Sequence, residues 1–524
     1  MRGLTKIKRH KVIKLKTIEW CYFLIIFCVI LAYSAYLPKH LGLDSWNVQN
    51  LYNQLDQMQS GHFEAVWAEA RFSCFSSGRF FRGLIFMLFA LAHKASWLVH
   101  PWVNWVAILF MCLSGCTLWK IFRNIISEKT ITATIIYICC LLVICNPFFT
   151  DWMHFIECQL YYPLALWLAI SSAGILQMDK QLSKTKRWLL ASGLLILSAG
   201  LYQIALQFFV MVSVGVSLLD MRGEKGINQI KKPMLKLMLA LSVYCIAAVT
   251  QLAIVLSMHS GRVKTKSFID IVEQLANTQR ALWTMVPYTK NPISILFPVL
   301  SVLLGLYFIG CVATSRLSGR EKIVRGFVSC LGFFGYYASL FLPLIVSELW
   351  FPQRSMVGFW GILFIMAIMG YCVNDDEYLI NIKQVICILA CVLLLSNINS
   401  CIRFGTDLYR VNSIDEMRGE LIFNAISEYE NTSGITIDKV AFYQDSGVTY
   451  TYPNIVSSFE NNEAAWSANW NYLSILETVS GRRFEQCDYS SEKFFQFYEK
   501  KMNWNEFDID QIRFQNNIAY IAIY

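Results

Sequence analysis

Long apolar runs separated by short polar segments make up most of the chain up to about residue 400. A helix needs about 20 apolar residues to cross the roughly 30 Å hydrocarbon core of a bilayer. Eleven runs meet or approach that length, at about residues 17–36, 101–120, 130–149, 159–177, 188–202, 203–219, 235–257, 292–314, 326–346, 355–373 and 384–402. This pattern predicts a polytopic α-helical membrane protein with about 11 transmembrane helices.

Basic residues mark one side of this predicted membrane region. They gather at the N-terminus and in every second loop, in Arg2 to Lys16, Lys120 to Lys129, Lys180 to Arg187, Arg222 to Lys232 and Arg316 to Arg325. The positive-inside rule places all of these clusters in the cytoplasm. We therefore expect an uncleaved N-terminal anchor with a cytoplasmic N-terminus. An odd number of spans then places the C-terminal segment outside.

One further apolar stretch, residues 83–92, is a candidate for an additional span. It has only about ten residues and lies between Arg82 and His93, which is more typical of an interfacial or re-entrant helix than of a span. If it crossed the membrane, every basic loop after it would lie outside, against the positive-inside rule. The sequence therefore predicts a helix that lies on the outer membrane surface.

The adjoining spans at 188–219 form one continuous apolar run. One long tilted helix is an alternative, but two short helices that meet at an outward turn near Tyr202 and Gln203 explain the basic loops on both sides better. Short, broken helices often line a cavity within the membrane.

The composition changes after about residue 403, which divides the chain into a transmembrane domain, 1–403, and a polar C-terminal domain, 404–524. Apolar residues follow helical spacing from Ile414 to Ile426, whereas 440–443 and 512–514 have the pattern of short strands. Asn516 and Asn517 favour a turn into a terminal strand. We expect a small α/β domain outside the cytoplasm.

Composition supports the membrane interpretation. Hydrophobic residues make up 56% of the chain and charged residues 15%, against about 25% charged residues in soluble domains. The formal net charge of +9 does not indicate nucleic-acid binding, because the basic residues lie in loops between apolar runs. Most of the 17 cysteines lie inside those runs, and Cys74, Cys158 and Cys487 are the candidates for a disulfide in outer segments. The histidines have no ligand spacing, so no metal site and no cofactor are predicted.

Ionisable residues concentrate in segments predicted to lie outside. The acids Asp44 and Glu157 and the cations Arg79, Arg262, Lys264, Lys266 and Arg354 all fall there. A carboxylate within reach of an acceptor hydroxyl can act as general base, and cations stabilise a departing lipid phosphate. Each residue also has a structural alternative, such as a solvated loop acid for Asp44, a helix cap for Glu157 or a snorkelling side chain for Arg79.

Three stretches are similar to those of a known family. They are Phe75-Ser-Ser-Gly-Arg-Phe-Phe-Arg-Gly-Leu84, then Asn146-Pro-Phe-Phe149 with Phe155-Ile-Glu157 and Tyr162-Pro-Leu-Ala-Leu166, and Ser198-Ala-Gly-Leu-Tyr-Gln203. In this order and topology the chain, over about residues 30–400, resembles the bacterial and phage serotype-converting glucosyltransferases that modify O-antigen. The resemblance implies the GT-C architecture of membrane glycosyltransferases, in which the first outer loop supplies an acid and is followed by an interfacial helix. Asp44 and residues 83–92 match those two parts.

The chain departs from the family at one position. The family often has two adjacent acids after the first span, whereas here Ser45 follows Asp44. The identity of the base therefore stays open, with Glu64, Glu69, Asp151 and Glu157 as alternates.

The resemblance also implies the reactants and the location. The donor is undecaprenyl-phosphate-linked glucose and the acceptor a repeat-unit sugar of lipopolysaccharide, at the periplasmic face of the bacterial inner membrane. A separate enzyme makes the donor and a small membrane protein flips it, while membrane lipids surround the spans.

The resulting hypothesis is a hexosyltransferase that uses a polyprenyl-phosphate sugar. Asp44 or Glu157 deprotonates the acceptor, the outer cations hold the phosphate, and Tyr202 with Gln203 forms the floor of the cavity. An O-antigen polymerase and a flippase or transporter of lipid-linked sugars are alternatives. A flippase should carry charges within its spans, and here the charges lie mainly at the outer ends. A non-enzymatic sensor or anchor is a third alternative, for which eleven spans are many.

Overall fold

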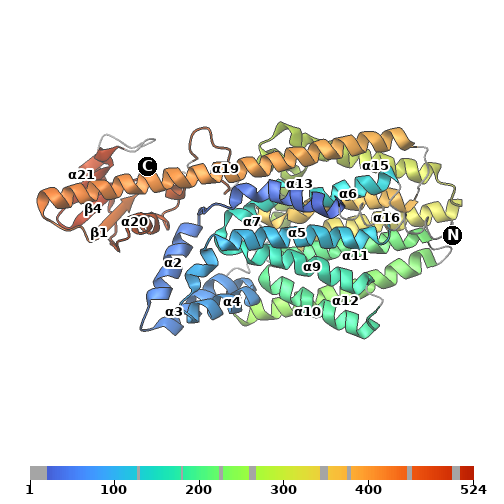
Figure 1. The fold of residues 1–524 in the computed structure, drawn as a ribbon, viewed down its shortest axis with the longest axis horizontal. Helices are drawn as coiled ribbons and strands as arrows, with labels where there is room; N and C mark the ends of the chain where they lie inside the picture. The colour runs from blue at the N-terminus through green and yellow to red at the C-terminus, as the bar shows by residue number, and fades with distance from the viewer. Residues whose placement is uncertain are drawn as a thin grey trace, which may run out of the picture.

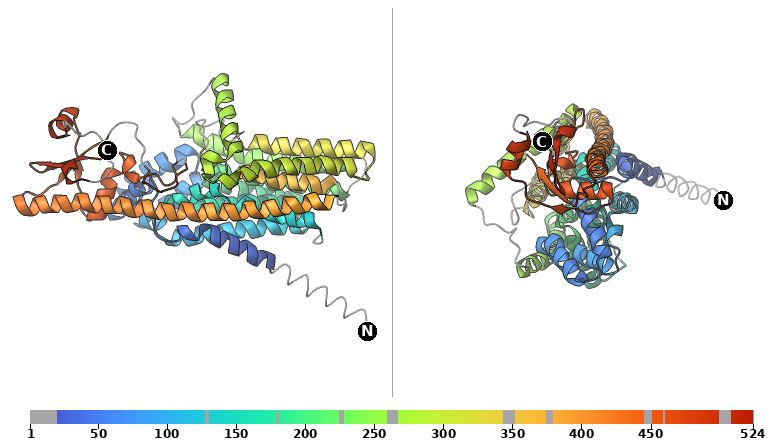
Figure 2. Two further views of the ribbon diagram at one scale, coloured as in Figure 1. Left: turned by 90° about the horizontal axis from the view of Figure 1, so that it is seen from above. Right: turned by 90° about the vertical axis from the view of Figure 1, so that its left-hand side faces the viewer.

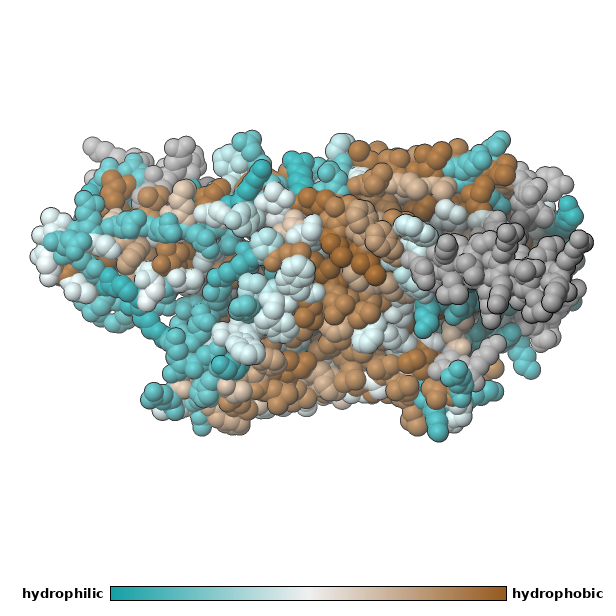
Figure 3. Space-filling view, in the orientation of Figure 1, coloured by the Kyte–Doolittle hydropathy of each residue, from teal (hydrophilic) through white to brown (hydrophobic). Residues whose placement is uncertain are grey.

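The computed structural model describes residues 20–126, 130–178, 181–223, 228–258, 267–342, 352–373, 379–444, 451–458, 460–498 and 508–523. It is an elongated bundle of helices, most of which run along its long axis, with a small α/β region at one end (Figure 1). Apolar surface covers much of the bundle, whereas the α/β end is largely polar (Figure 3). The apolar surface suits a chain whose surroundings are largely lipid.

Seven helical segments of the described chain are long and apolar enough to cross a membrane. The helices of the bundle are Trp20–Tyr36, α5 (Trp102–Arg123), α6 (Ile131–Ile144), α9 (Tyr161–Met178), α10 (Lys184–Leu201), α11 (Leu206–Asp220), α12 (Asn228–Ser257), α15 (Leu296–Thr314), α16 (Gly319–Ser339), α18 (Gly361–Val373) and the first part of α19 (Ile380–Ser433). The prediction of a polytopic helical membrane protein is confirmed. The count of eleven spans stays a prediction.

The predicted break in the run 188–219 is confirmed. Helix α10 ends at Leu201, Tyr202 is extended with φ −159° and ψ 115°, and the 3-10 turn η6 (Gln203–Ala205) leads into α11. Close packing surrounds the end of α10, because a Cβ on Gly200 would approach the ring of Phe81 to 2.6 Å. The turn therefore lies directly against α4 (Phe80–Leu91), which carries Phe81.

The segment between the first two spans folds into short helices rather than a loop. They are α2 (Ser45–Gln57), α3 (His62–Glu69), the π-helical turn η2 (Ala70–Cys74), the 3-10 turn η3 (Phe75–Ser77), α4 and the 3-10 helix η4 (Ala95–Val99). With 12 residues, α4 is about 18 Å long, too short to cross the hydrocarbon core. This agrees with the prediction that residues 83–92 are not a span.

Short elements connect the remaining helices on the same side as the site described below. They are η5 (Pro147–Phe149), α7 (Thr150–His154), α8 (Ile156–Gln159), α13 (Phe268–Thr284), α14 (Val286–Thr289), η8 (Pro292–Ile295), η9 (Gln353–Ser355) and η10 (Val357–Trp360). Asn146 begins the first of these turns by accepting a hydrogen bond from the backbone of Phe148 at 3.1 Å.

Helix α19 is continuous over 54 residues and connects the bundle to the α/β region (Figures 1 and 2). At 1.5 Å per residue it is about 81 Å long, much more than the roughly 30 Å that the hydrocarbon core requires. Its second half therefore extends beyond any membrane that its first half crosses. The predicted boundary at residue 403 lies inside this helix rather than in a linker.

The α/β region contains a four-stranded sheet in the order β2-β1-β4-β3. Its elements are β1 (Lys439–Tyr443), η12 (Ala465–Ser467), α20 (Tyr472–Ser480), β2 (Glu485–Gln486), α21 (Ser491–Tyr498), η13 (Ile509–Gln511), β3 (Ile512–Gln515) and β4 (Ile518–Ala522). Strands β3 and β4 form an antiparallel hairpin whose turn contains Asn516 at φ 55°, so the predicted terminal hairpin is confirmed. Both β2 and β4 pair in parallel with β1.

The α/β region and the first outer segment share a hydrophobic core. Buried side chains of α2, such as Trp46 and Tyr52, belong to the same cluster as Trp466 and Ile475 of the α/β region. The bundle has a separate and larger core. The C-terminal region is thus packed against the segment that carries Asp44.

Candidate functional site

Arg354 lies at the centre of a cluster of charged residues between the bundle and the α/β region. Its Nη1 donates to both carboxylate oxygens of Asp151 at 3.3 Å and to Oε2 of Glu460 at 2.7 Å. Burial opposes the charge on Arg354, but the two carboxylates outweigh it and raise the pKa of the guanidinium. Arg354 is therefore a permanent cation between two acids.

The backbone around Arg354 is held as firmly as its side chain. The N–H of Arg354 donates to Asp151 at 3.0 Å, and its carbonyl accepts hydrogen bonds from Trp152 Nε1 at 2.9 Å and the Tyr202 hydroxyl at 3.2 Å. These bonds connect η9, α7 and the break between α10 and α11. The sequence predicted Asp151, Tyr202 and Arg354 as separate candidates, and the structure brings them together.

The C-terminal region contributes residues that the sequence analysis missed. Glu460 reaches Arg354, and Asn461 Nδ2 donates to Gln353 Oε1 at 2.9 Å. Burial, together with the neighbouring charge of Glu460, raises the pKa of Glu463 to about 7. No local pattern signals these residues, because they follow an irregular segment far from the predicted spans.

Asp44 precedes the first residue of α2 and faces the same cluster. Its Oδ1 accepts a hydrogen bond from the indole Nε1 of Trp470 at 3.1 Å. The residue is accessible to solvent, yet the dense surrounding chain partly desolvates it and raises its pKa. Glu460 adds to this rise, whereas Trp470 and Arg354 oppose it. An accessible carboxylate with a raised pKa has the properties of a general base.

Glu157, unlike the solvent-exposed Asp44, lies in the interior of the protein. It is buried, and its Oε2 accepts a hydrogen bond from the hydroxyl of Ser45 at 2.8 Å. Ser45 thus connects Asp44 to a carboxylate from α8. Arg82 is also buried, with its guanidinium 5.3 Å from the ring centre of Tyr161 and Nη1 3.5 Å from the sulfur of Cys158. Of the two predicted bases, Asp44 is the one that solvent reaches.

Arg79 is held on a tight turn with its guanidinium over two aromatic rings. The turn depends on Gly78, at φ +76°, and on side-chain amides that donate to it: Gln203 to the carbonyl of Ser77 and Gln251 to that of Gly78. These bonds fix the backbone of the two residues that precede Arg79.

The rings below Arg79 are those of Tyr202 and Tyr162, whose centres lie 5.3 Å and 5.8 Å from the guanidinium carbon. The two rings stack with centres 3.7 Å apart. No carboxylate of the described chain forms an ion pair with Arg79, in contrast to Arg354. Its charge is thus available for an anion.

The other predicted candidates lie apart from this cluster or outside the described residues. Glu64 is exposed in the first turn of α3, and Glu69 accepts a hydrogen bond from Ser73. Neither contacts Asp44 or Arg354 in the described chain. The predicted cations Arg262, Lys264 and Lys266 lie outside the described residues.

Two further questions from the sequence concern cysteines and metals. All 17 cysteines are free, so Cys74, Cys158 and Cys487 form no disulfide in this structure. Within the described ranges, no group of three or more His, Cys, Asp or Glu side chains is arranged to hold a metal ion.

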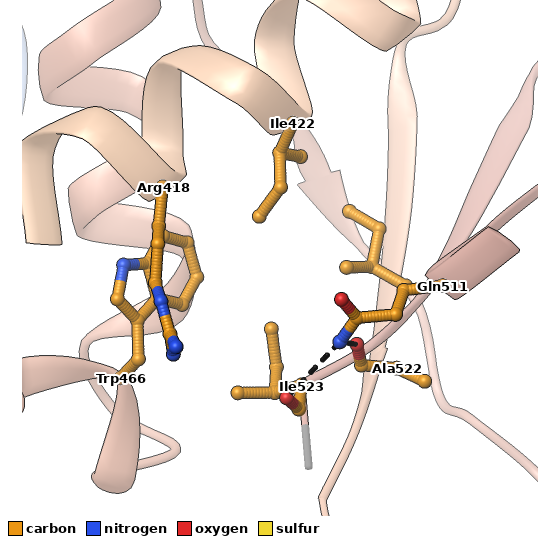
Figure 4. A pocket seen from close by; sticks show the side chains of 7 residues that line it. Arg418, Ile422, Trp466, Gln511, Ala522 and Ile523 are labelled. Atoms are coloured by element: carbon orange, nitrogen blue, oxygen red, sulfur yellow. Dashed lines mark hydrogen bonds between the residues drawn. The ribbon is translucent and has the colours of Figure 1, made fainter. Parts of the chain in front are cut away.

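A small cavity lies in the α/β region, between α19 and the end of β4 (Figure 4). It is lined by Arg418, Ile422, Trp466, Gln511, Ile521, Ala522 and Ile523. The amide of Gln511 donates to the carbonyls of Ala522 and Ile523 at 2.9 Å and 3.3 Å. None of the charged residues around Arg354 lines this cavity, which is a gap in the packing of the α/β region.

Residues 69–374, more than half of the chain, match the family described as Glucosyl transferase GtrII. The chain belongs to this family and is therefore a membrane glycosyltransferase, which confirms the resemblance found in the sequence.

Comparison with curated proteins finds no match. Among solved structures, the oligosaccharyltransferase of Archaeoglobus fulgidus, crystallised with zinc and sulfate, aligns at 11% identity with a TM-score of 0.40. The alignment covers 88% of this chain and 62% of that protein. At this TM-score the similarity carries no argument about the site.

Proposed function

We propose that this protein transfers a hexose, namely glucose, from undecaprenyl phosphate to a repeat-unit sugar of O-antigen lipopolysaccharide. The family supports the sugar and the reaction class. The observation that carries the proposal is the site itself, in which the accessible Asp44 lies within the electrostatic influence of Arg354. The guanidinium of Arg79, which pairs with no carboxylate of the described chain, lies over the ring of Tyr202, whose hydroxyl donates to the carbonyl of Arg354. A base and a phosphate-binding cation are what this reaction requires.

In the proposed reaction, Asp44 takes the proton from an acceptor hydroxyl while the hydroxyl oxygen attacks the anomeric carbon of the donor. The bond between that carbon and the phosphate oxygen breaks, and its electron pair leaves with the polyprenyl phosphate. Arg79 stabilises the charge that develops on the phosphate. Arg262, Lys264 and Lys266 are proposed to help stabilise this negative charge.

Arg354 has a different role in this proposal. Both Asp151 and Glu460 already neutralise it, so it is less suited to a phosphate than Arg79. It instead holds α7, η9 and the C-terminal region together beside Asp44. Glu157 accepts a hydrogen bond from Ser45, the neighbour of Asp44, and is the second candidate for the base.

The topology follows the charge pattern. We propose that 11 spans place the N-terminus in the cytoplasm and the site in the periplasm of a bacterial inner membrane. Residues 404–524 then form the periplasmic region that completes the site. A separate donor-synthesising enzyme and a small flippase would supply the lipid-linked glucose, because the site faces away from the cytoplasm.

Replacing Asp44 tests the proposal. Cells that express Asp44→Asn should lose the added hexose on their lipopolysaccharide, because asparagine cannot accept the proton. Glu485→Gln is the matched control, since Glu485 is an exposed acid of the C-terminal region that pairs with Lys439 and was not a candidate for the base. Mass analysis of the surface glycan gives the result as one hexose per repeat unit. Normal modification by Asp44→Asn excludes Asp44 as the base, and a change of chain length without added hexose supports a polymerase instead.

A further inference from the structure

Trp470 is an exposed aromatic side chain held directly against Asp44. Its indole is 54% exposed, and its Nε1 donates to the Asp44 carboxylate at 3.1 Å. Two other tryptophans of the same region, Trp46 and Trp466, are almost completely buried and belong to the shared core. The shared core therefore does not account for the open face of Trp470.

The chain that follows Trp470 is bound to the start of α2 by hydrogen bonds. Asn471, which follows it, is buried and donates from its side chain to the carbonyl of Leu43. Further along α20, Ser474 donates to Asn47 at 3.3 Å. These bonds tie the start of α20 to the start of α2.

A third bond extends this contact, since Asn50 Nδ2 donates to Glu477 Oε2 at 2.7 Å. Helices α2 and α20 thus pack side by side, one carrying Asp44 at its start and the other preceded by Trp470. The exposure of the indole comes from its orientation and not from a loose segment.

We propose that Trp470 is a binding platform for a sugar ring of the acceptor glycan and that its N–H positions the Asp44 carboxylate beside that ring. The inference rests on the proposed function for the reaction but adds the residue that receives the acceptor. A pyranose ring has an apolar C–H face and a rim of hydroxyls. The flat indole offers a large apolar surface with a polar edge, which suits such a ring.

The arrangement explains how one hydroxyl meets the base. The hydrogen bond fixes the carboxylate at the edge of the indole, so a sugar that stacks on the indole face has its rim of hydroxyls next to that carboxylate. The ligand class is therefore a neutral hexopyranose unit of a polysaccharide, rather than the lipid donor.

Two variants of Trp470 separate the platform from the hydrogen bond. Trp470→Ala removes both, and Trp470→Phe keeps an aromatic face but removes the N–H. Transfer is measured with the purified full-length protein in lipid nanodiscs, undecaprenyl-phosphate glucose as donor and purified O-antigen oligosaccharides of defined repeat unit as acceptors. The matched control is Trp97→Ala, because Trp97 is 51% exposed and does not contact the site.

We expect Trp470→Ala to raise the KM for the acceptor about tenfold, as for the loss of one aromatic contact, with the KM for the donor unchanged. Trp470→Phe should keep most of the acceptor affinity. In the native protein, the hydrogen bond from Trp470 lowers the pKa of Asp44. Both variants lose this bond, so the pKa of Asp44 should rise and the acidic limb of the pH–rate profile should move to higher pH. Glu157, Glu460 and Arg354, which also act on Asp44, remain in both variants.

A binding measurement distinguishes this inference from the proposed function. Saturation-transfer NMR should detect the oligosaccharide on the Asp44→Asn protein and lose it on Asp44→Asn with Trp470→Ala. An unchanged acceptor KM in Trp470→Ala overturns the platform, and an unmoved acidic limb in Trp470→Phe overturns the positioning role even when the alanine variant does not fold. Binding through Trp470 without any hexose transfer by the wild-type protein would support the platform and refute the proposed function.

Discussion

Arg354 and Asp151 form a buried ion pair although 203 positions separate them in the chain. Both the guanidinium and the backbone N–H of Arg354 donate to the same carboxylate. The pair joins α7, which lies in the segment between the predicted spans 130–149 and 159–177, to η9, which precedes α18. Since Glu460 binds the same guanidinium, one cation holds two connecting segments of the bundle and the C-terminal region together.

Removing that cation should destabilise the protein. Arg354→Ala removes the guanidinium from the buried carboxylate of Asp151, which keeps only its hydrogen bond from the backbone N–H of residue 354. Removing one partner of a buried pair costs about 3–5 kcal/mol, and the remaining hydrogen bond places the loss toward the lower end of that range. Thermal unfolding in detergent measures the loss. Arg403→Ala is the control, because Arg403 is 57% exposed and its pair with Asp407 should contribute at most about 1 kcal/mol. Equal effects of the two variants would contradict a structural role for Arg354.

Glu460 should set the pH dependence of transfer through Asp44. The negative charge of Glu460 raises the pKa of Asp44, and Asp44 is active as a base only when deprotonated. Glu460→Gln removes that charge and lowers the pKa, so the acidic limb of the pH–rate profile should move to lower pH. Glu485→Gln, an exposed acid of the same region, should leave the limb in place. If the limb stays fixed in Glu460→Gln, then either Asp44 is not the group whose titration limits the rate or Glu460 does not affect its pKa.

Arg79 should contribute to donor binding as a planar cation. Arg79→Lys keeps the charge but loses the flat guanidinium that lies over Tyr162 and Tyr202. Lysine cannot bind a phosphate through two parallel N–H groups, and one hydrogen bond to a charged group is worth about 1.5–3 kcal/mol, so the KM for the donor should rise about tenfold or more. Arg71→Lys is the control, because Arg71 is exposed in η2. The prediction fails if the acceptor KM rises in place of the donor KM.

The turn that carries Arg79 offers a test by paired glycine variants. Gly78 and Gly61 both have positive φ, +76° and +66°, so alanine is strained at either position by about 1 kcal/mol. A Cβ on Gly78 would also meet Gln251 and Val255, whereas a Cβ on Gly61 meets nothing within 4 Å. Gly78→Ala should therefore displace Arg79 and impair donor binding, and Gly61→Ala should cause only a small loss of stability. Kinetics with the lipid donor and thermal unfolding measure the two effects.

Hydropathy, charge and turn residues predicted those features of the fold that depend on neighbouring residues in the chain. The hydropathy of the runs predicted the membrane class, and the basic loops on both sides of 188–219 predicted the break that the structure has at Tyr202. Asn516 predicted the terminal hairpin, because asparagine adopts positive φ readily.

The contacts that complete the site were not predictable in this way. Trp470 and Asp44 are 426 positions apart, and the segment around Glu460 has no periodic pattern. Tertiary packing of α20 on α2 brings these residues together, and no single-sequence signal reports such packing. The domain boundary at 403 was placed where composition changes, but α19 continues through it because a helix persists while its surroundings change from apolar to polar.

The proposed donor and acceptor both depend on the orientation of the membrane domain. The basic loops predict a cytoplasmic N-terminus, and α19 carries the C-terminal region well beyond the hydrocarbon core. An alkaline phosphatase reporter fused after residue 524 should be active in the periplasm, whereas one inserted in the loop at 181–183 should be inactive. The second fusion serves as the control for reporter export. An inactive C-terminal fusion, with the reporter at 181–183 active, would place Asp44, Arg79 and Trp470 in the cytoplasm. Such a site could not reach a periplasmic glycan, and the donor and acceptor proposed here would both be wrong.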